Sequence, residues 1–202
     1  LPHRSDAKNE LIYGDVTVPH KAIENNITFA IDWVTGQKTG FFIDQREHRK
    51  TLMSFVANKK VLNTFCYSGG FSLFALAGDA SEVHSVDASQ KAIDLLERNL
   101  VLNVFNGKHV SVVADAVKYV EQIGEDFDVI ILDPPAFAKH TNKRHNAIKA
   151  YTRLNAHAIQ KIKSGGVIFT FSCSQVVSAE QFQNAVVAAA IQCKRNVRIL
   201  HQ

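Results

Sequence analysis

Residues 61–71 read Val-Leu-Asn-Thr-Phe-Cys-Tyr-Ser-Gly-Gly-Phe. An apolar run stops at two adjacent glycines, and a stretch compatible with a helix, residues 71–77, follows directly. Two later apolar runs, 127–132 and 167–171, end in Asp-Pro-Pro-Ala-Phe and in Ser-Cys-Ser. Because the carboxyl ends of parallel strands form one crevice in an open sheet, we expect these three strand ends to meet around one ligand.

Hydrophobic patterning predicts strands that alternate with helices along most of the chain. This alternation indicates an α/β fold with a mostly parallel sheet and helices on both faces. Asp44, with Glu47 three residues later, resembles a capping box at the start of the first helix. The predicted strands are 61–65, 82–86, 109–113, 127–132, 166–171 and 196–200, and the predicted helices are 44–55, a segment from Gly70, 90–102, 145–162 and 179–192.

The first 36 residues have a different pattern. Apolar residues recur at every second position from Ile27 to Trp33, which is typical of a strand. Asn25-Asn26 can form a tight turn to a strand at 21–24. A hairpin of this size cannot build its own core. We therefore expect residues 1–36 to be a β-hairpin appendage, or the remnant of another domain, and residues 37–202 to be the main domain.

Composition limits the class of protein. A chain of 202 residues suits one large domain with an appendage. No apolar run approaches the ~20 residues of a membrane span, and the first residues lack the pattern of a signal peptide. The three cysteines, Cys66, Cys173 and Cys193, have no metal-ligand spacing and are too scattered for a disulfide framework. We expect a cytoplasmic protein with no metal and no membrane partner.

Charge is distributed unevenly along the chain. Residues 134–202 contain ten Lys or Arg and one acid, Glu180, for a net charge of +9, whereas residues 1–133 have a net charge of −5. A polyanion bound beside the crevice would gain from this positive field. The alternative is a solvated helix face with no such partner.

Two acids follow the glycine turn at the ends of later strands. Asp87 lies about 20 residues after the turn, where a carboxylate can accept hydrogen bonds from both ribose hydroxyls of a nucleoside cofactor. The turn is not G-x-G-x-x-G, which argues against a dinucleotide. Asp115 follows the strand at 109–113 and could accept from an adenine amino group. For both acids the alternative is a helix cap.

The other two strand ends carry different chemistry. In Asp133-Pro134-Pro135 the two prolines fix φ and remove two donors, which gives a rigid turn able to grip the amino edge of a flat base, or a purely structural turn. Cys173 lies at a strand end, where the positive field of Lys139 or Arg144 would favour its thiolate and make it a nucleophile. Its alternative is a small buried core residue. We expect Cys193 to be a core residue and Cys66 to pack near the cofactor.

Together these residues resemble class I S-adenosylmethionine-dependent methyltransferases, which have a Rossmann-like sheet with helices on both faces. More closely, the chain is similar to the bacterial family that makes 5-methylcytosine in large-subunit ribosomal RNA. The stretches that carry the similarity are Arg4-Ser5-Asp6, residues 36–46, residues 63–71, residues 133–137 and Phe171-Ser172-Cys173-Ser174.

The resemblance implies a role for each matching residue. The turn at 65–70 would hold the methionine moiety, Asp87 the ribose and Asp115 the adenine, while Asp133 would contact the target base and Cys173 would be the nucleophile. The implied cofactor-binding residues are Phe41, Gln45, Arg46, Phe65, Tyr67, Ser68, Gly69, Asp87, Asp115 and Asp133. Residues expected at the RNA are Pro134, Pro135, Phe137, Lys139, Lys143 and Arg144. The implied partner is ribosomal RNA, the product is S-adenosylhomocysteine (SAH), and a homodimer is left open.

The chain departs from the family pattern in two ways. Family members usually begin with an RNA-binding PUA domain and continue beyond the equivalent of Gln202 with a closing strand pair, so we expect this chain to be a fragment or a shortened relative. Some RNA cytosine methyltransferases have a second cysteine after the two prolines, where this chain has Ala136. The alternatives are an amino-group methyltransferase acting on guanine or adenine, which needs no cysteine, and a non-catalytic fragment that binds RNA or the cofactor. A small-molecule methyltransferase would leave the basic half unexplained.

Overall fold

The computed structural model describes residues 13–15, 18–34, 36 and 39–202. Its centre is a sheet of five parallel strands in the order β5-β4-β3-β6-β7. The strands are β3 (Lys60–Thr64), β4 (Glu82–Asp87), β5 (Lys108–Val113), β6 (Val129–Leu132) and β7 (Val167–Thr170). The strand order reverses between β3 and β6, which is where open α/β sheets bind ligands. The predicted sheet is confirmed.

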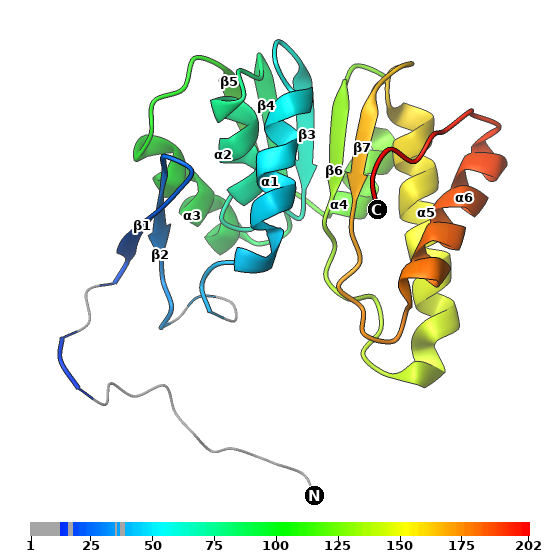
Figure 1. Cartoon of the computed structure of the whole chain (residues 1–202), viewed down its shortest axis with the longest axis horizontal. Helices are drawn as coiled ribbons and strands as arrows, with labels where there is room; N and C mark the ends of the chain where they lie inside the picture. Colours follow the sequence, from blue (N-terminus) through cyan, green and yellow to red (C-terminus); the bar gives the residue numbers. More distant parts are fainter. Residues whose placement is uncertain (1–12, 16–17, 35, 37–38) are drawn as a thin grey trace, which may run out of the picture.

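Helices cover both faces of the sheet, as predicted (Figure 1). They are α1 (Arg46–Leu52), α2 (Gly70–Ala77), α3 (Gln90–Val101), α4 (Ala116–Gln122), α5 (Arg144–Lys161) and α6 (Ala179–Cys193). Because neighbouring residues of a strand point to opposite faces, Leu62 and Ile130 pack with α4 and α5. Val61 and Ile131 pack with α1 and α2 on the other face. Helix α6 lies against α5.

The predicted hairpin is confirmed as β1 (His20–Glu24) paired antiparallel with β2 (Ile27–Ile31). Asn25 and Asn26 both have positive φ, 49° and 65°, as a tight hairpin turn requires. Ile27 and Phe29 are buried in one cluster with residues of α2 and α3. The division at residue 36 stays a prediction, and the expected motif Arg4-Ser5-Asp6 lies outside the described residues.

Two asparagines of the α3 region attach the hairpin to the main domain. Asn99 Oδ1 accepts a hydrogen bond from the Ala30 backbone N–H at 2.7 Å. Asn103 Oδ1 accepts a hydrogen bond from the Thr28 backbone N–H at 2.9 Å, and Asn103 Nδ2 donates one to the Thr28 carbonyl at 2.8 Å. These side chains satisfy the backbone groups of a strand edge that would otherwise lack a partner.

Two local predictions are wrong, and one helix was not predicted. Residues 196–200 form no strand, because among the described residues no neighbouring strand pairs with them, and Leu200 is exposed. Helix α4 was not predicted, although Asp115 begins it as an N-cap. The expected capping box is absent because residues 43–45 form a 3₁₀ turn, and α1 begins at Arg46 without a side-chain cap.

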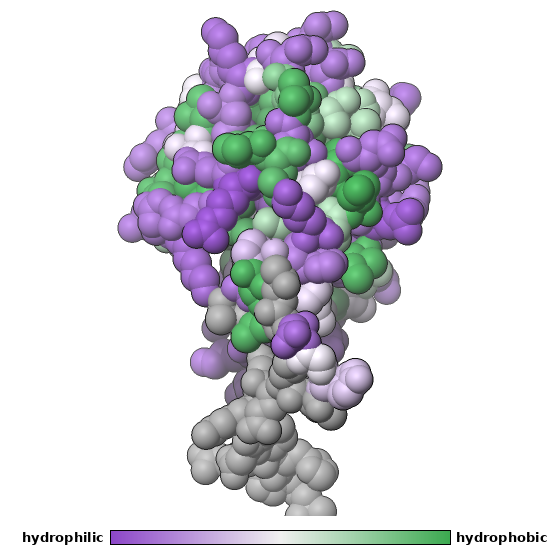
Figure 2. Space-filling view, turned by 90° about the vertical axis from the view of Figure 1, so that its left-hand side faces the viewer, coloured by the Kyte–Doolittle hydropathy of each residue, from purple (hydrophilic) through white to green (hydrophobic). Residues whose placement is uncertain are grey.

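The surface on the side of β5 and α3 mixes polar and apolar residues (Figure 2). Hydrophilic residues cover most of this side, and hydrophobic ones form separate patches between them. Val101 at the end of α3 and Val104 just after it are almost fully exposed. Among the helices that the structure describes, none combines the length and apolar character needed to cross a membrane.

Candidate active site

The strand ends meet at one edge of the sheet, as the sequence predicts. Strand pairing places Asp87 opposite Val113 and Thr64 opposite both Val86 and Leu132. The glycine turn therefore lies between the end of β4, which carries Asp87, and the end of β6, which leads to Asp133. The loops that follow β6 and β7 lie side by side at the same edge (Figure 1).

The glycine turn after β3 has an unusual backbone. Phe65, Tyr67 and Gly69 have φ values of 55°, 46° and 80°, so three of the five residues at 65–69 have positive backbone φ angles. A Cβ added to Gly69 would lie 2.1 Å from Leu96 Cδ1 of α3. Gly69 therefore makes room for α3, and the expectation that these glycines also let a ligand approach the backbone stays a prediction. Ser68 is buried, and its backbone carbonyl accepts a hydrogen bond from Asn99 Nδ2 at 2.8 Å.

Asp87 is half-buried beside this turn. Its Oδ2 accepts a hydrogen bond from the Tyr67 backbone N–H at 3.0 Å, and its Oδ1 accepts one from the Ser89 N–H at 2.9 Å. The N-cap of α3 is Ser89, so the helix-cap alternative for Asp87 does not hold. A carboxylate has about four lone-pair positions. The two backbone bonds fix Asp87 and leave acceptor capacity on each oxygen, which fits a ribose diol.

Asp115 is exposed at the end of β5, where it caps α4. Its side chain accepts a hydrogen bond from the Lys118 N–H at 3.0 Å. The helix-cap interpretation is therefore confirmed, and the adenine contact stays a prediction that the cap does not exclude.

The segment 41–46 lies between the hairpin and the glycine turn. The Phe41 ring packs on Phe29, with 4.8 Å between centroids. It is the neighbouring Phe42 ring that meets Tyr67, at 5.5 Å. Gln45 Oε1 bonds His48 Nδ1 at 2.8 Å, and the Arg46 side chain is exposed. The predicted contacts of Phe41, Gln45 and Arg46 with the cofactor stay predictions.

Arg49 is the residue at this edge that the sequence did not single out. It is 2% exposed, and its guanidinium binds the Glu24 carboxylate of the hairpin through Nε and Nη2 at 2.8 and 2.9 Å. Its Nη1 donates to the Phe42 carbonyl at 2.9 Å, and its Cζ lies 4.7 Å from the Phe41 ring centroid. Arg49 thus joins the hairpin to segment 41–46. A single arginine in a charged helix gives no sequence signal for such burial.

Hydrogen bonds join the segment after β7 to the segment after β6. Cys173 Sγ donates to the Pro134 carbonyl at 3.7 Å, and Ser174 Oγ donates to the Ala138 carbonyl at 3.1 Å. Asp133 precedes this turn and is half-buried. Pro134 is buried, Pro135 is exposed and Phe137 packs on Tyr151 of α5.

The three cysteines have different environments. Cys173 is exposed, so the alternative of a buried core residue is wrong for it. Cys66 is buried within the glycine turn, and burial raises the pKa of its thiol. Cys193 is half-buried on α6, and its Sγ donates to the Ala156 carbonyl at 3.2 Å. Cys173 therefore combines an accessible thiol with a place at a strand end.

The expected basic groups lie in the loop that leads from Asp133 to α5. Lys139 and Lys143 are exposed, and Arg144 is half-buried at the start of α5. The residues that line a surface hollow here are Thr141, Asn142, Arg144, His145 and Ile148. The positive residues are thus adjacent to the turn that would hold a base, and their contact with RNA stays a prediction.

Comparison with known proteins places the chain in a family. Residues 2–188 match the model of S-adenosylmethionine-dependent methyltransferases. The chain is 39% identical over 197 residues to ribosomal RNA large subunit methyltransferase I of Shewanella frigidimarina, covering 95% of this chain and 50% of that protein. The Escherichia coli protein of the same name is 39% identical over 183 residues, covering 89% of this chain and 46% of its own length. The chain thus spans about half the length of these curated relatives.

Solved structures support the same assignment. SMU.776 complexed with SAH is similar with a TM-score of 0.77 and 27% identity, over 88% of this chain and 48% of that one. A SAM-dependent methyltransferase from Agrobacterium tumefaciens has a TM-score of 0.73 at 22% identity, over 90% of this chain and 61% of that one, and shows the fold alone. The chain therefore belongs to the S-adenosylmethionine-dependent methyltransferase family.

Proposed function

We propose that this chain is the catalytic part of a ribosomal RNA methyltransferase that methylates C5 of cytosine through a covalent adduct with Cys173. The names of the curated relatives support a ribosomal RNA substrate. The observation that carries the cytosine assignment is the exposed Cys173 thiol. This thiol donates a hydrogen bond to the Pro134 carbonyl of the Asp133-Pro134-Pro135 turn.

The cofactor would lie along the ends of β3, β4 and β5. The left-handed turn at 65–70 would hold the methionine part, Asp87 the ribose and Asp115 the adenine, with Phe41, Gln45 and Arg46 beside them. The fixed Asp87 carboxylate, with capacity left on both oxygens, is the feature that fits a nucleoside. When bound, S-adenosylmethionine supplies an electrophilic methyl group on a sulfonium.

The chain's own residues would activate the base. C5 of cytosine is a weak nucleophile, so the Cys173 thiolate adds to C6 and C5 gains electron density. Asp133 holds N3 and the amino group of the base. C5 would then accept the methyl group as the bond between this methyl and the sulfonium sulfur breaks, which leaves the thioether SAH. Loss of the C5 proton to a base restores the C5–C6 double bond as the bond from C6 to Cys173 breaks.

RNA would approach from the side of the loop between β6 and α5. Lys139 and Lys143 lie on this loop, which follows the turn at Pro134 and Pro135, and Arg144 begins α5 directly after it. Positive residues there would bind phosphates close to the flipped or unpaired base and would make affinity depend on salt. Phe137 is half-buried next to them and offers an apolar surface.

The test is trapping of the adduct. RNA with 5-fluorocytosine at the target cannot lose a proton from C5, so a stable conjugate between protein and RNA should accumulate with the cofactor present. Cys173→Ser should give neither conjugate nor methylated RNA. Cys193→Ser removes a thiol far from the site and is the matched control, which should still give the conjugate.

An amino-group methyltransferase is the second candidate, since an Asp-Pro-Pro turn can also hold an exocyclic amine. An amine has its own lone pair and needs no thiol. Methylation of RNA at an ordinary rate by Cys173→Ser would therefore contradict the cytosine assignment and support this alternative.

A further inference from the structure

Arg49 of α1 is a charged side chain buried between the hairpin and the glycine turn. The side chain is 3% exposed, and its guanidinium Cζ lies 4.7 Å from the Phe41 ring centroid and 5.7 Å from that of Phe74 of α2. Burying a charge costs free energy, and well-packed apolar residues often replace a buried ion pair without loss of stability. Stability alone therefore gives a weak reason for a guanidinium at this position.

The second glycine of the turn leaves space for Arg49. A Cβ added to Gly70 would lie 3.2 Å from Arg49 Cδ and 3.6 Å from its Nη1. The guanidinium has little freedom to move aside, because hydrogen bonds hold its Nε, Nη1 and Nη2. Gly69 thus makes room for α3 and Gly70 for Arg49, so the guanidinium lies directly against the start of α2.

Arg49 also fixes the backbone of Phe42. Its Nη1 donates to the Phe42 carbonyl at 2.9 Å, at a point where the chain belongs to neither a helix nor a strand. The Phe42 ring meets the Tyr67 ring edge to face, with 5.5 Å between centroids and 81° between planes. The Tyr67 N–H in turn donates to Asp87 at 3.0 Å. One series of contacts therefore runs from Arg49 through Phe42 and Tyr67 to the carboxylate that fits a ribose.

The other end of this series is the Glu24 carboxylate of the hairpin. Both of its oxygens accept hydrogen bonds from Arg49, at 2.8 and 2.9 Å, and the Glu24 side chain is 11% exposed. A bidentate pair fixes the plane of the guanidinium as well as its distance from the carboxylate. Glu24 therefore sets the direction in which Nη1 points toward Phe42.

We propose that Arg49 is a positioning residue for the cofactor: with Glu24 it holds Phe42 against Tyr67 before the cofactor binds, and so couples the hairpin to the cofactor site. The inference rests on the part of the proposed function that places the cofactor beside the glycine turn. A segment that is already in place pays no ordering cost when the ligand binds, and this preorganisation raises affinity.

Coupling of this kind acts in both directions. If the attached hairpin favours cofactor binding, the bound cofactor must favour the attached hairpin by the same factor. Binding of SAH should therefore slow amide hydrogen exchange in β1, although this strand is expected to make no contact with the ligand.

The experiment measures the affinity for SAH by calorimetry. Arg49→Lys keeps the positive charge, but one ammonium cannot reproduce the bidentate fork and also reach the Phe42 carbonyl. It should weaken SAH binding by about tenfold, the size of one charge-assisted hydrogen bond. Asn103→Ala is the matched control, because it loosens the hairpin at Thr28 and leaves the contacts of Arg49 in place. Its affinity for SAH should stay within a factor of about two.

A second variant covers the case in which Arg49→Lys folds poorly. Glu24→Gln keeps the size of the side chain but replaces one acceptor oxygen by an amide donor that cannot bind the guanidinium. The freed guanidinium holds Phe42 less firmly, so affinity for SAH should fall by about threefold. Hydrogen exchange in β1 should slow on addition of SAH in the unchanged chain and slow less in either variant.

Unchanged affinity for SAH in both variants would overturn the proposal and leave Arg49 as a structural residue. An equal loss in Asn103→Ala would overturn it too, because any loosening of the hairpin would then suffice. These measurements use neither RNA nor Cys173. A failure to trap 5-fluorocytosine RNA would therefore refute the cytosine assignment without deciding this inference.

Discussion

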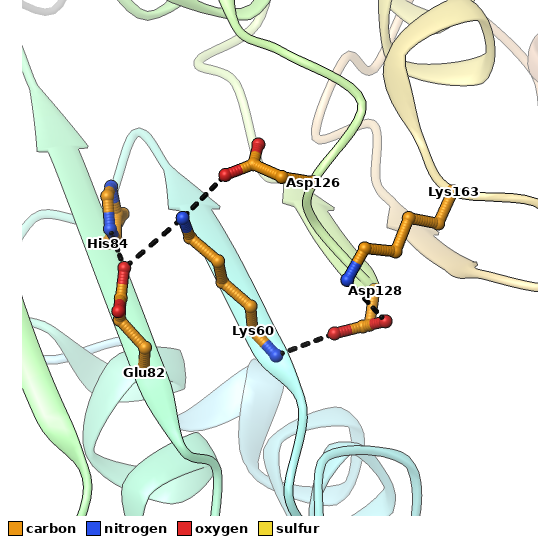
Figure 3. Close-up of polar contacts among 6 residues, drawn as sticks. All are labelled: Lys60, Glu82, His84, Asp126, Asp128 and Lys163. Carbon is orange, nitrogen blue, oxygen red and sulfur yellow. Dashed lines mark hydrogen bonds and ion pairs between the residues drawn. The ribbon is translucent and has the colours of Figure 1, made fainter.

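The two ends of the central sheet use charged residues in opposite ways. At the amino ends of β3, β4 and β6, charges bind one another (Figure 3). Lys60 Nζ contacts Asp126 at 2.5 Å and Glu82 at 3.3 Å. Asp128 accepts from the Lys60 N–H at 2.8 Å and from Lys163 Nζ at 3.1 Å.

At the carboxyl ends, Asp87 and Asp115 accept hydrogen bonds from backbone N–H groups, and no lysine or arginine is bound to either of them in the salt bridges of the described residues. Asp87 is held by two such N–H groups and Asp115 by one. A carboxylate bound by a backbone donor keeps its charge and its remaining lone pairs for a ligand, whereas a carboxylate bound by lysine is already neutralised. The ion pairs at the amino end thus contribute to the stability of the sheet, whereas the acids at the carboxyl end keep the acceptor capacity that the proposed cofactor site requires.

The largest expected effect tests whether the carboxyl end also contributes to stability. Arg49→Met should lower the free energy of unfolding by about 3–5 kcal/mol, because it leaves the Glu24 carboxylate buried without its partner. Urea unfolding at pH 7 measures the change. The double variant Glu24→Gln with Arg49→Met should recover part of the loss, since it no longer buries an unpaired charge. Equal losses in both variants would contradict this account.

The next effect concerns the rate of RNA methylation, which should depend on the carboxyl ends of the strands and not on their amino ends. Asp133→Asn should reduce the rate of RNA methylation by about 100- to 1,000-fold, the typical cost of losing one preorganised electrostatic group. The matched change at the other end, Asp126→Asn, should leave the rate within a factor of about two. A single-turnover assay with radiolabelled cofactor compares them. A similar rate loss in both variants would show that the effect passes through stability.

The sequence predicted the features that depend on the chain order. Apolar runs ending in glycine, aspartate and cysteine gave the parallel sheet and the five strand ends, because buried parallel strands are continuous apolar segments. The turn at Asn25-Asn26 also followed from local chemistry. These features need no knowledge of distant contacts.

The errors arise where a distant contact decides the outcome. Residues 196–200 have the composition of a strand but no neighbouring strand in the described part of the chain. The contact of Gly69 with Leu96 of α3 was likewise not foreseen, because it joins two segments that are distant in the sequence. Arg49 gave no signal, because it acquires its structural role only from groups that contact it from other segments.

A smaller effect concerns the loss of stability in acid, which we assign to His109 of β5. His109 Nε2 bonds Ser85 Oγ at 2.8 Å within the sheet, and burial lowers the pKa of His109 from 6.5 to about 4. The folded state therefore binds this proton less readily than the unfolded state, so stability is present above pH 6.5 and is lost as the pH falls toward 4. The loss should be about 2 kcal/mol after allowance for solvent screening.

His109→Asn keeps a polar side chain at this position and removes the titration. Urea unfolding between pH 7 and 4 should show a shallower fall in stability for the variant than for the unchanged chain. Parallel curves would contradict the assignment of acid sensitivity to His109.

The smallest expected effect belongs to the amino end itself. Lys60→Met should lower the free energy of unfolding by about 1 kcal/mol at pH 7, because these ion pairs are partly exposed and screened by salt.

Hydrogen bonding to Asp126 raises the pKa of Lys60, and the bond to Lys60 lowers the pKa of Asp126. The stability from Asp126 is therefore present above its unfolded pKa of about 4 and is lost as the pH falls through its folded value. That from Lys60 is present below 10.5 and is lost as the pH rises through its folded value. Lys60→Met should flatten both limbs of the profile of unfolding free energy against pH, and about 0.5 M salt should do the same to a smaller degree.

The affinity of Lys60→Met for SAH, measured by calorimetry, should not change, because SAH is expected at the opposite end of the strands. A weaker affinity in Lys60→Met would show that the two ends are coupled through the sheet and would break the comparison.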